Sequence, residues 1–291
     1  MAVVALIAVA AGLVWGAIYA RRGSLVFATA ALVVVAYVFG HYFWNARVGP
    51  LPLTLDRLLL VGLGAAFVAQ WRWGLIERKP LTGVDWLLAA MLAVLTASAI
   101  LAGTPDVVPP DVGSPMWRLV MSFAVPGVIY VIARMAPLVH RSWCGWLAVM
   151  SLLGVYLSLT ALAEVTERWA LVFPRYIADP MLGIHFGRAR GPELNSASLG
   201  IYLTACLWCA WMLRSQVARG WQLMLLIAMP LMALGIFFTY TRSTWIGLAA
   251  SAAVVGWLQM PRAWRVPMFT LGTLAGVLFA TVAWNDVVGL K

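Results

Sequence analysis

Apolar runs about as long as a bilayer is thick recur along almost the whole chain, and they restrict its possible folds more than any other feature. A helix needs roughly 20 apolar residues to cross the hydrocarbon core of a membrane. Ten segments of this kind are present, at residues 2–20, 24–43, 57–76, 85–103, 117–138, 142–163, 196–213, 221–240, 244–260 and 266–284. We therefore expect an all-α, polytopic membrane protein with about ten transmembrane helices, in a single transmembrane domain over residues 1–291.

The composition favours this fold and excludes an ordinary soluble domain. Of the 291 residues, 64% are hydrophobic and only 10% are charged, whereas a soluble domain carries roughly 25% charged residues. A net charge of +10 is also typical of nucleic-acid binding, but here the cations are dispersed between apolar runs. Membrane orientation and anionic lipid explain them better, so we expect membrane lipids as partners and no nucleic acid.

Loops on alternate sides of the predicted helices differ in charge. The short loops at 21–22, 77–79, 214–219 and 262–265 belong to a strongly basic side, while the other side holds nearly as many acids as cations. Short basic loops stay in the cytoplasm when a membrane protein inserts. We therefore place the basic side in the cytoplasm and both chain ends outside.

Two loops on the predicted outer side concentrate arginine. The longer runs from Glu164 to Asn195 and contains Arg188 and Arg190, and the shorter, TYTRSTWIG, contains Arg242. Guanidinium groups bind phosphate oxygens with paired hydrogen bonds, so several facing one cavity would hold a diphosphate without a metal. We expect Arg188, Arg190 and Arg242 to form such a site; the alternative is that they only reach from helix ends to lipid headgroups.

The sequence around these arginines also indicates local structure. Gly191-Pro192 breaks the chain and lets backbone approach a ligand closely. Asn195 or Ser196 is the expected N-cap of the next helix, whose first amides would favour a phosphate. His185 lies beside the cluster and is a candidate general base, although a lone loop histidine is more often an interfacial residue.

Metal and cofactor chemistry find little support in the sequence. Cys206 and Cys209 form a C-x-x-C motif inside an apolar run, but no third or fourth ligand accompanies them, so we interpret them as packing residues. His41 and His140 fall on opposite predicted sides and cannot share a metal. The sequence also has no P-loop, no H-E-x-x-H and no serine-hydrolase elbow, and we expect no metal and no cofactor.

Three segments resemble the O-antigen ligase and O-antigen polymerase superfamily, the membrane glycosyltransferases of bacterial surface-polysaccharide assembly. RGPELNSASLGIYL at 190–203 is similar to the family's R-x-G…N…G-x-Y-L at the start of a helix. TRSTWIGL at 241–248 is similar to S-R-x-x-W-L-x-L, and GPLPLTLDR at 49–57 is similar to the start of an early helix. The resemblance gives supporting roles to Gly191, Asn195, Gly200 and Ser243.

The resemblance implies a metal-independent transfer of a glycan from undecaprenyl diphosphate to a glycan or lipid acceptor, as in lipopolysaccharide biosynthesis. The reaction would take place at the periplasmic face of the bacterial inner membrane. Family members carry a large periplasmic loop after the last helix seen here, with a catalytic histidine in ligases and an arginine motif in polymerases. Because this chain stops at Lys291, we expect the N-terminal part of a longer protein, and ligase and polymerase are not distinguished.

Two other functions fit the same arginines. A transporter or flippase for a lipid-linked or anionic solute would use them as a transit site. Such proteins show internal repeats and polar residues near the middle of the membrane, and the sequence shows neither. A structural membrane subunit without chemistry would tolerate replacement of all three arginines.

Overall fold

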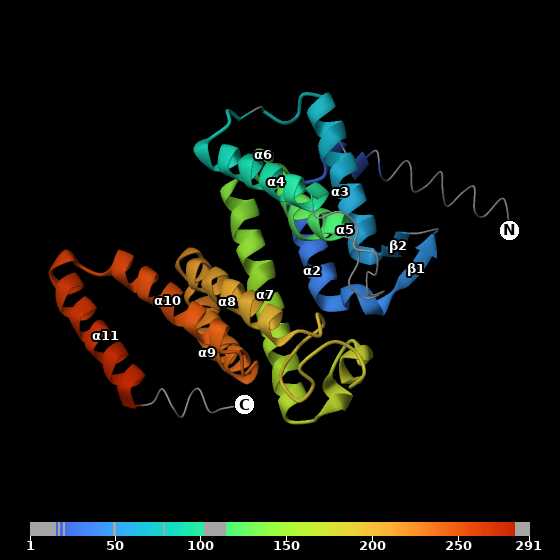
Figure 1. The fold of residues 1–291 in the computed structure, drawn as a ribbon. Helices are drawn as coiled ribbons and strands as arrows, with labels where there is room; N and C mark the ends of the chain where they lie inside the picture. The colour runs from blue at the N-terminus through green and yellow to red at the C-terminus, as the bar shows by residue number, and fades with distance from the viewer. Residues whose placement is uncertain are drawn as a thin grey trace.

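The computed structural model describes residues 16, 18–19, 21–48, 51–77, 79–101 and 115–282 (Figure 1). Most of these residues are helical, which confirms the all-α prediction, and a helix lies at every predicted segment from 24–43 onward. The segment 2–20 falls largely outside the described residues. The helices are α2 (Leu25–Phe43), α3 (Leu55–Arg72), α4 (Gly83–Leu101), α5 (Pro115–Leu119), α6 (Val125–Met135), α7 (His140–Val165), α8 (Ser196–Leu213), α9 (Arg219–Phe238), α10 (Arg242–Gln259) and α11 (Arg262–Val282).

Four helices in the described part of the chain are long and apolar enough to cross a membrane: α4, α7, α9, and α8 together with the turn that follows it. They indicate a membrane protein whose helices contact lipid. The expectation of about ten spans is not confirmed. In α2 the helix is interrupted at Gly40, which has a φ of 64°, and α3 carries the charged residues Asp56, Arg57 and Arg72. A π-helical turn, Val120–Ala124, joins α5 to α6.

A short β-hairpin that was not expected from the sequence joins α2 to α3. Strand β1 (Asn45–Val48) pairs antiparallel with β2 (Leu51–Thr54), from Asn45 opposite Thr54 to Val48 opposite Leu51. The two-residue alternation of a strand is hard to recognise in a stretch that is both short and mostly apolar. Gly49 and Pro50, which belong to the family-like segment at 49–57, lie outside the described residues.

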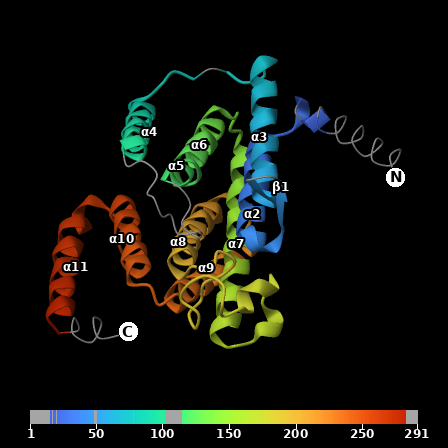
Figure 2. The same cartoon turned by 45° about the vertical axis from the view of Figure 1, so that its right-hand side comes forward.

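Helices α7, α8 and α9 form the centre of the molecule, and α7 runs through the middle in both views (Figures 1 and 2). Gly154 of α7 makes the close packing possible, because a Cβ atom there would lie 2.6 Å from the Cβ of Cys206. Cys206 is a free, fully buried thiol in this core, as expected of a packing residue. A second core forms between α2, α3 and α6.

Two opposite ends of this bundle matter for function. The segment 166–195 lies at one end of α7 (Figures 1 and 2), and α8 and α10 begin beside it; we call this the loop end. The eighteen residues of α8 extend about 27 Å away from it at 1.5 Å per residue, to the turn at Arg214–Gln216. We call this second region the turn end.

Candidate functional site

Residues 166–195 form an ordered cap at the loop end. Ala163, Val172, Ile177 and Leu194 build a small apolar core inside it. Two 3₁₀ turns, Trp169–Leu171 and Arg175–Ala178, provide its short regular elements. Because this segment has a core of its own, it holds side chains in fixed positions at the end of the bundle.

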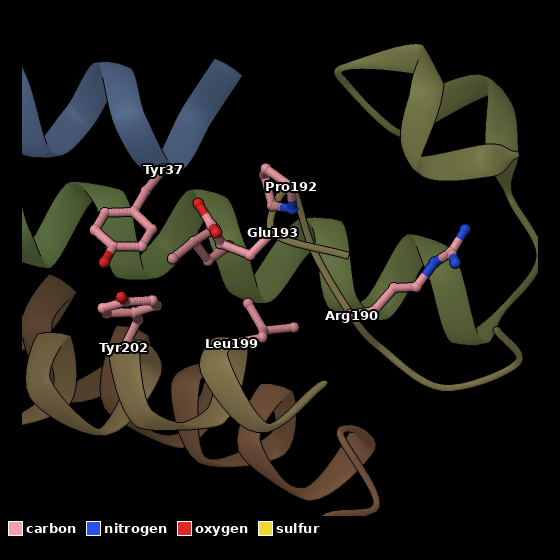
Figure 3. Close-up of a pocket in the computed structure, with 7 residues that line it drawn as sticks. Tyr37, Arg190, Pro192, Glu193, Leu199 and Tyr202 are labelled. Carbon is pink, nitrogen blue, oxygen red and sulfur yellow. The ribbon is translucent and has the colours of Figure 1, made fainter. Parts of the chain in front are cut away.

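Arg190 is the central polar residue of this cap. Its side chain is only 1% exposed, and its guanidinium donates hydrogen bonds to three backbone carbonyls of the same loop: Ile177 at 2.7 Å, Asp179 at 2.6 Å, and Leu182. Figure 3 shows the side chain pointing toward the loop and away from Tyr37 and Tyr202. Arg190 would have to release these carbonyls to contact a diphosphate directly, so a ligand role for it stays a prediction.

Glu164, near the end of α7, completes the anchor of this segment. Its carboxylate is 5% exposed and accepts hydrogen bonds from the backbone N–H groups of Arg190, at 3.1 Å, and Gly191, at 2.8 Å. Burial lowers the pKa of the Arg190 guanidinium, and the nearby Glu164 opposes this effect. Gly191, with a φ of 59°, adopts the left-handed turn conformation that its predicted chain-breaking role requires.

The structure brings the two arginine-bearing segments together, although they lie fifty residues apart in the sequence. The N–H of Ala189 donates to the carbonyl of Phe238 at 3.1 Å. The Nη1 of Arg188 donates to the carbonyl of Tyr240 at 3.4 Å. Arg242, exposed, is the first residue of α10. Arg188 and the start of α10, where Arg242 lies, are therefore neighbours on the surface of the loop end, whereas Arg190 is buried.

Hydroxyl groups connect the cap to the starts of α8 and α10. The Nδ1 of His185 lies 3.0 Å from the Oγ of Ser196, and the Oγ1 of Thr241 lies 3.2 Å from the same oxygen. Ser196 is fully buried, so its hydroxyl contacts His185 and Thr241 and is not exposed to solvent. His185 has a φ of 64°. It is exposed, so its ring is accessible to solvent. Its role as a base stays a prediction.

The residues expected to support the site lie around this contact. Asn195 is the N-cap of α8, because its side-chain oxygen accepts from the N–H groups of Ala197 at 3.0 Å and Ser198 at 3.5 Å; the prediction of a cap here is confirmed. At Gly200 a Cβ atom would lie 2.6 Å from the Cγ2 of Thr244, so α8 and α10 meet closely at this point. Ser243 is exposed beside Arg242.

A second polar feature, Glu193, was not recognised in the sequence. It lies in a narrow crevice with Pro192, Tyr37 of α2, and Tyr202 of α8 (Figure 3). Its carboxylate has no hydrogen-bond partner among the described residues. Burial, and secondarily the nearby carboxylate of Asp56, raise the pKa of Glu193 to about 6. In the sequence, an acid between a Gly-Pro pair and a helix cap is typical of a solvated loop residue. Its contact with α2 could not be predicted, because that contact depends on the tertiary fold.

The site has no obvious metal centre in the part of the chain that the structure describes, where no group of three or more His, Cys, Asp and Glu side chains is placed to hold an ion. Its chemical resources are instead two surface arginines, an accessible imidazole and a carboxylate of raised pKa. Comparison of the chain with protein-family models, with curated proteins and with solved structures found no match.

Proposed function

We propose that this chain belongs to a membrane glycosyltransferase of the O-antigen ligase type. It would transfer a glycan from undecaprenyl diphosphate to a hydroxyl of a glycan or lipid acceptor, at the periplasmic face of a bacterial inner membrane. The observation that supports this most is the contact between segments 188–190 and 238–242 at the loop end. The same two segments carry the family-like sequence motifs, and a shared site is what a common substrate requires.

In this proposal Arg188 and Arg242 bind the diphosphate. Both belong to the surface of the loop end, and a guanidinium fork fits two phosphate oxygens at once. When the bond between the sugar carbon and the phosphate oxygen breaks, the departing undecaprenyl diphosphate gains negative charge. Cations that are already in position stabilise that charge more in the transition state than in the substrate.

The acceptor hydroxyl loses its proton as its oxygen forms the new bond to the sugar carbon. His185 is the candidate base. In the tautomer whose Nδ1–H donates to Ser196 Oγ, 3.0 Å away, the Nε2 atom is left as a proton acceptor on the exposed side of the ring. The proton then passes from the imidazolium to solvent or to the released diphosphate.

Arg190 and Glu164 act in this proposal as positioning residues. The Arg190 guanidinium fixes the carbonyls of residues 177–182, and Glu164 fixes the backbone at 190–191. Together they hold Arg188 beside the start of α10. Loss of Arg190 would therefore displace the site without removing a group that touches the substrate.

Replacement of the two surface arginines tests the proposal. In the complete protein expressed in its own host, we expect Arg188→Ala and Arg242→Ala each to lower surface-glycan assembly about 100-fold, the usual effect of removing one transition-state donor. Arg168→Ala, which removes an exposed arginine of the same cap, is the matched control and should stay near wild type. Membrane insertion is measured for each variant. Wild-type glycan levels in both inserted arginine variants would exclude this function.

The runner-up, a transporter or flippase, predicts a different outcome for the same variants. The arginines would then affect movement of the lipid-linked glycan across the bilayer, and the donor would fail to reach the outer leaflet. In the transferase, the donor reaches that leaflet and accumulates there unused. Labelling of the outer-leaflet glycan lipid in the Arg188→Ala strain separates the two functions.

A further inference from the structure

The turn end contains a polar pocket that the glycan-transfer proposal does not use. A cavity of about 230 Å³ opens where the 3₁₀ turn Arg214–Gln216 follows α8, and it is lined by Arg214, Ser215, Gln222 and Leu226. The guanidinium carbon of Arg214 lies 3.5 Å from the centre of the Trp211 ring. A cation over the face of an indole is attracted by the ring, so this contact holds the guanidinium beside the pocket.

Arg214 has a side chain suited to an anion. Among the described residues it makes no ion pair and its guanidinium makes no hydrogen bond. The hydroxyl of Ser215 already donates to the carbonyl of Met212, at 3.1 Å, and the Nε2 of Gln222 to the carbonyl of Val217, at 2.9 Å. Arg214 is therefore the donor left for an anion in this lining. Arg219 begins α9 a few residues later. The lining of the pocket holds one cation, Arg214, and no carboxylate.

An apolar groove continues directly from this pocket. It has a volume of about 510 Å³ and is lined by side chains of α8, α9 and α10, among them Trp208, Trp211, Leu226, Pro230, Ala252 and Gly256. Leu226 lines both the pocket and the groove, and Trp211 lines the groove while it stacks on Arg214. A hydrogen bond of 2.9 Å from Trp208 Nε1 to Ser251 Oγ joins α8 to α10 along its wall.

The length of this combined site matches one leaflet of a bilayer. Along α9 it extends from Gln222 to Ala233, about 16 Å at 1.5 Å per residue. Half of the hydrocarbon core is about 15 Å thick. A molecule with a charged head at Arg214 and chains in the groove therefore has the dimensions of a phospholipid in the leaflet at the turn end.

We propose that the pocket at Arg214 and the groove between α8, α9 and α10 bind one anionic glycerophospholipid, with its phosphate on Arg214 and an acyl chain in the groove. An apolar cavity between helices in a membrane has no polar partners to hold water, and lipid chains are the apolar molecules present there. The positive turn selects an anionic headgroup over a zwitterionic one. The proposal depends on the membrane setting of these helices and is independent of glycan transfer.

Lipid binding to the purified, complete protein tests this site. Native mass spectrometry compares phosphatidylglycerol with phosphatidylcholine of the same acyl chains, and inorganic phosphate is added as a competitor. We expect a preference for phosphatidylglycerol that Arg214→Gln lowers about fivefold, the effect of one surface cation on anionic lipid. Arg262→Gln, at the first residue of α11, is the matched control and should leave the preference unchanged.

A second variant tests the groove separately from the pocket. A Cβ atom at Gly256 meets no other atom within 4 Å, so this position has room for a side chain, and Gly256→Leu places one in the groove. We expect it to weaken binding of both lipids while the protein unfolds at the wild-type temperature or higher. Equal binding of both lipids by wild type, an unchanged preference in Arg214→Gln, or displacement of phosphatidylglycerol by inorganic phosphate would each overturn the proposal. Cross-linking that places a protein segment in the groove would also overturn it.

Discussion

The two ends of the bundle use arginine in opposite ways. At the loop end, Arg190 is buried and its guanidinium is bonded to three carbonyls of its own loop. At the turn end, Arg214 is stacked on one tryptophan and makes no ion pair among the described residues. The first stabilises a fold, and the second is able to bind a ligand. An arginine has five N–H donors. It stabilises the fold when they are bonded to groups of the protein, and it is available to a ligand when they are not.

The largest effect is expected at the buried arginine. Arg190→Ala would leave the carbonyls of Ile177, Asp179 and Leu182 without their donor, while Glu164 keeps its two backbone donors. We expect a cost of roughly 3–5 kcal/mol in the free energy of unfolding. We also expect protease cleavage within 166–195 to become faster. Thermal unfolding and limited proteolysis of the purified protein measure both.

The matched control for this change is Arg168→Ala, which removes an exposed arginine from the same loop. We expect it to unfold as wild type does. If the Arg190→Ala protein unfolds at the wild-type temperature and its loop resists protease as well as the wild-type loop does, Arg190 does not stabilise the fold. The difference between the two ends of the bundle would then not hold.

A smaller effect is expected where α2 meets the loop. Gly40 has a φ of 64°, and a Cβ atom there would overlap the hydroxyl of Tyr176. That hydroxyl is within hydrogen-bond distance of the carbonyls of Phe39, 2.6 Å, and Pro192, 2.8 Å. We expect Gly40→Ala to lower the free energy of unfolding by about 2–3 kcal/mol, measured by thermal unfolding.

Tyr176→Phe provides the matching test, because it removes the overlapping oxygen. In the double variant, Tyr176→Phe with Gly40→Ala, part of the loss should be recovered, since only the strain of the positive φ remains. Additive losses in the double variant would show that Tyr176 does not hold α2 to the loop.

The smallest effect concerns the acid in the crevice. The folded protein holds the pKa of Glu193 at about 6, above its ordinary value of 4.5. The folded state therefore binds this proton more tightly than the unfolded state does, which favours folding below pH 4.5, and the contribution is lost as pH rises through 6. Glu193 is partly exposed, so the effect is about 1 kcal/mol or less.

We expect Glu193→Gln to unfold at a higher temperature than wild type at pH 7.5 and to differ little from it at pH 5. Unfolding curves at the two pH values measure this. Glu167→Gln, at an exposed carboxylate, is the control and should show no such dependence. A Glu193→Gln protein less stable than wild type at pH 7.5 would mean that the carboxylate has a partner in the folded state.

Much of the fold was predictable from hydropathy. The apolar runs locate the helices within a few residues. This is possible because an apolar run is a property of one segment and does not depend on the rest of the fold. The cap at Asn195 was predictable as well, since a side chain that bonds its own next turn is a local feature. The expectation of about ten spans is not confirmed, since four helices in the described part of the chain are long and apolar enough to cross a membrane. A kink at Gly40 interrupts α2, and α3 carries charged residues.

The candidate site was predictable only in part. The sequence indicated that Arg188, Arg190 and Arg242 belong together, and the structure places their segments side by side. The sequence did not indicate that Arg190 lies inside the loop. The acceptors of Arg190 are backbone carbonyls, which every residue has, so they cannot be recognised from the residue types. The crevice at Glu193 was missed for a similar reason, since Tyr37 of α2 is remote in the chain.

The central claim is that Arg188 and Arg242 bind a lipid diphosphate at the loop end. The most direct measurement is the affinity of the purified, complete protein for undecaprenyl diphosphate, in wild type and in the Arg188→Ala, Arg242→Ala and Arg168→Ala variants. We predict that each of the first two weakens binding about tenfold or more and that Arg168→Ala, at an exposed arginine of the same cap, leaves it unchanged. Wild-type affinity in both Arg188→Ala and Arg242→Ala, or an equal loss in Arg168→Ala, would contradict this account.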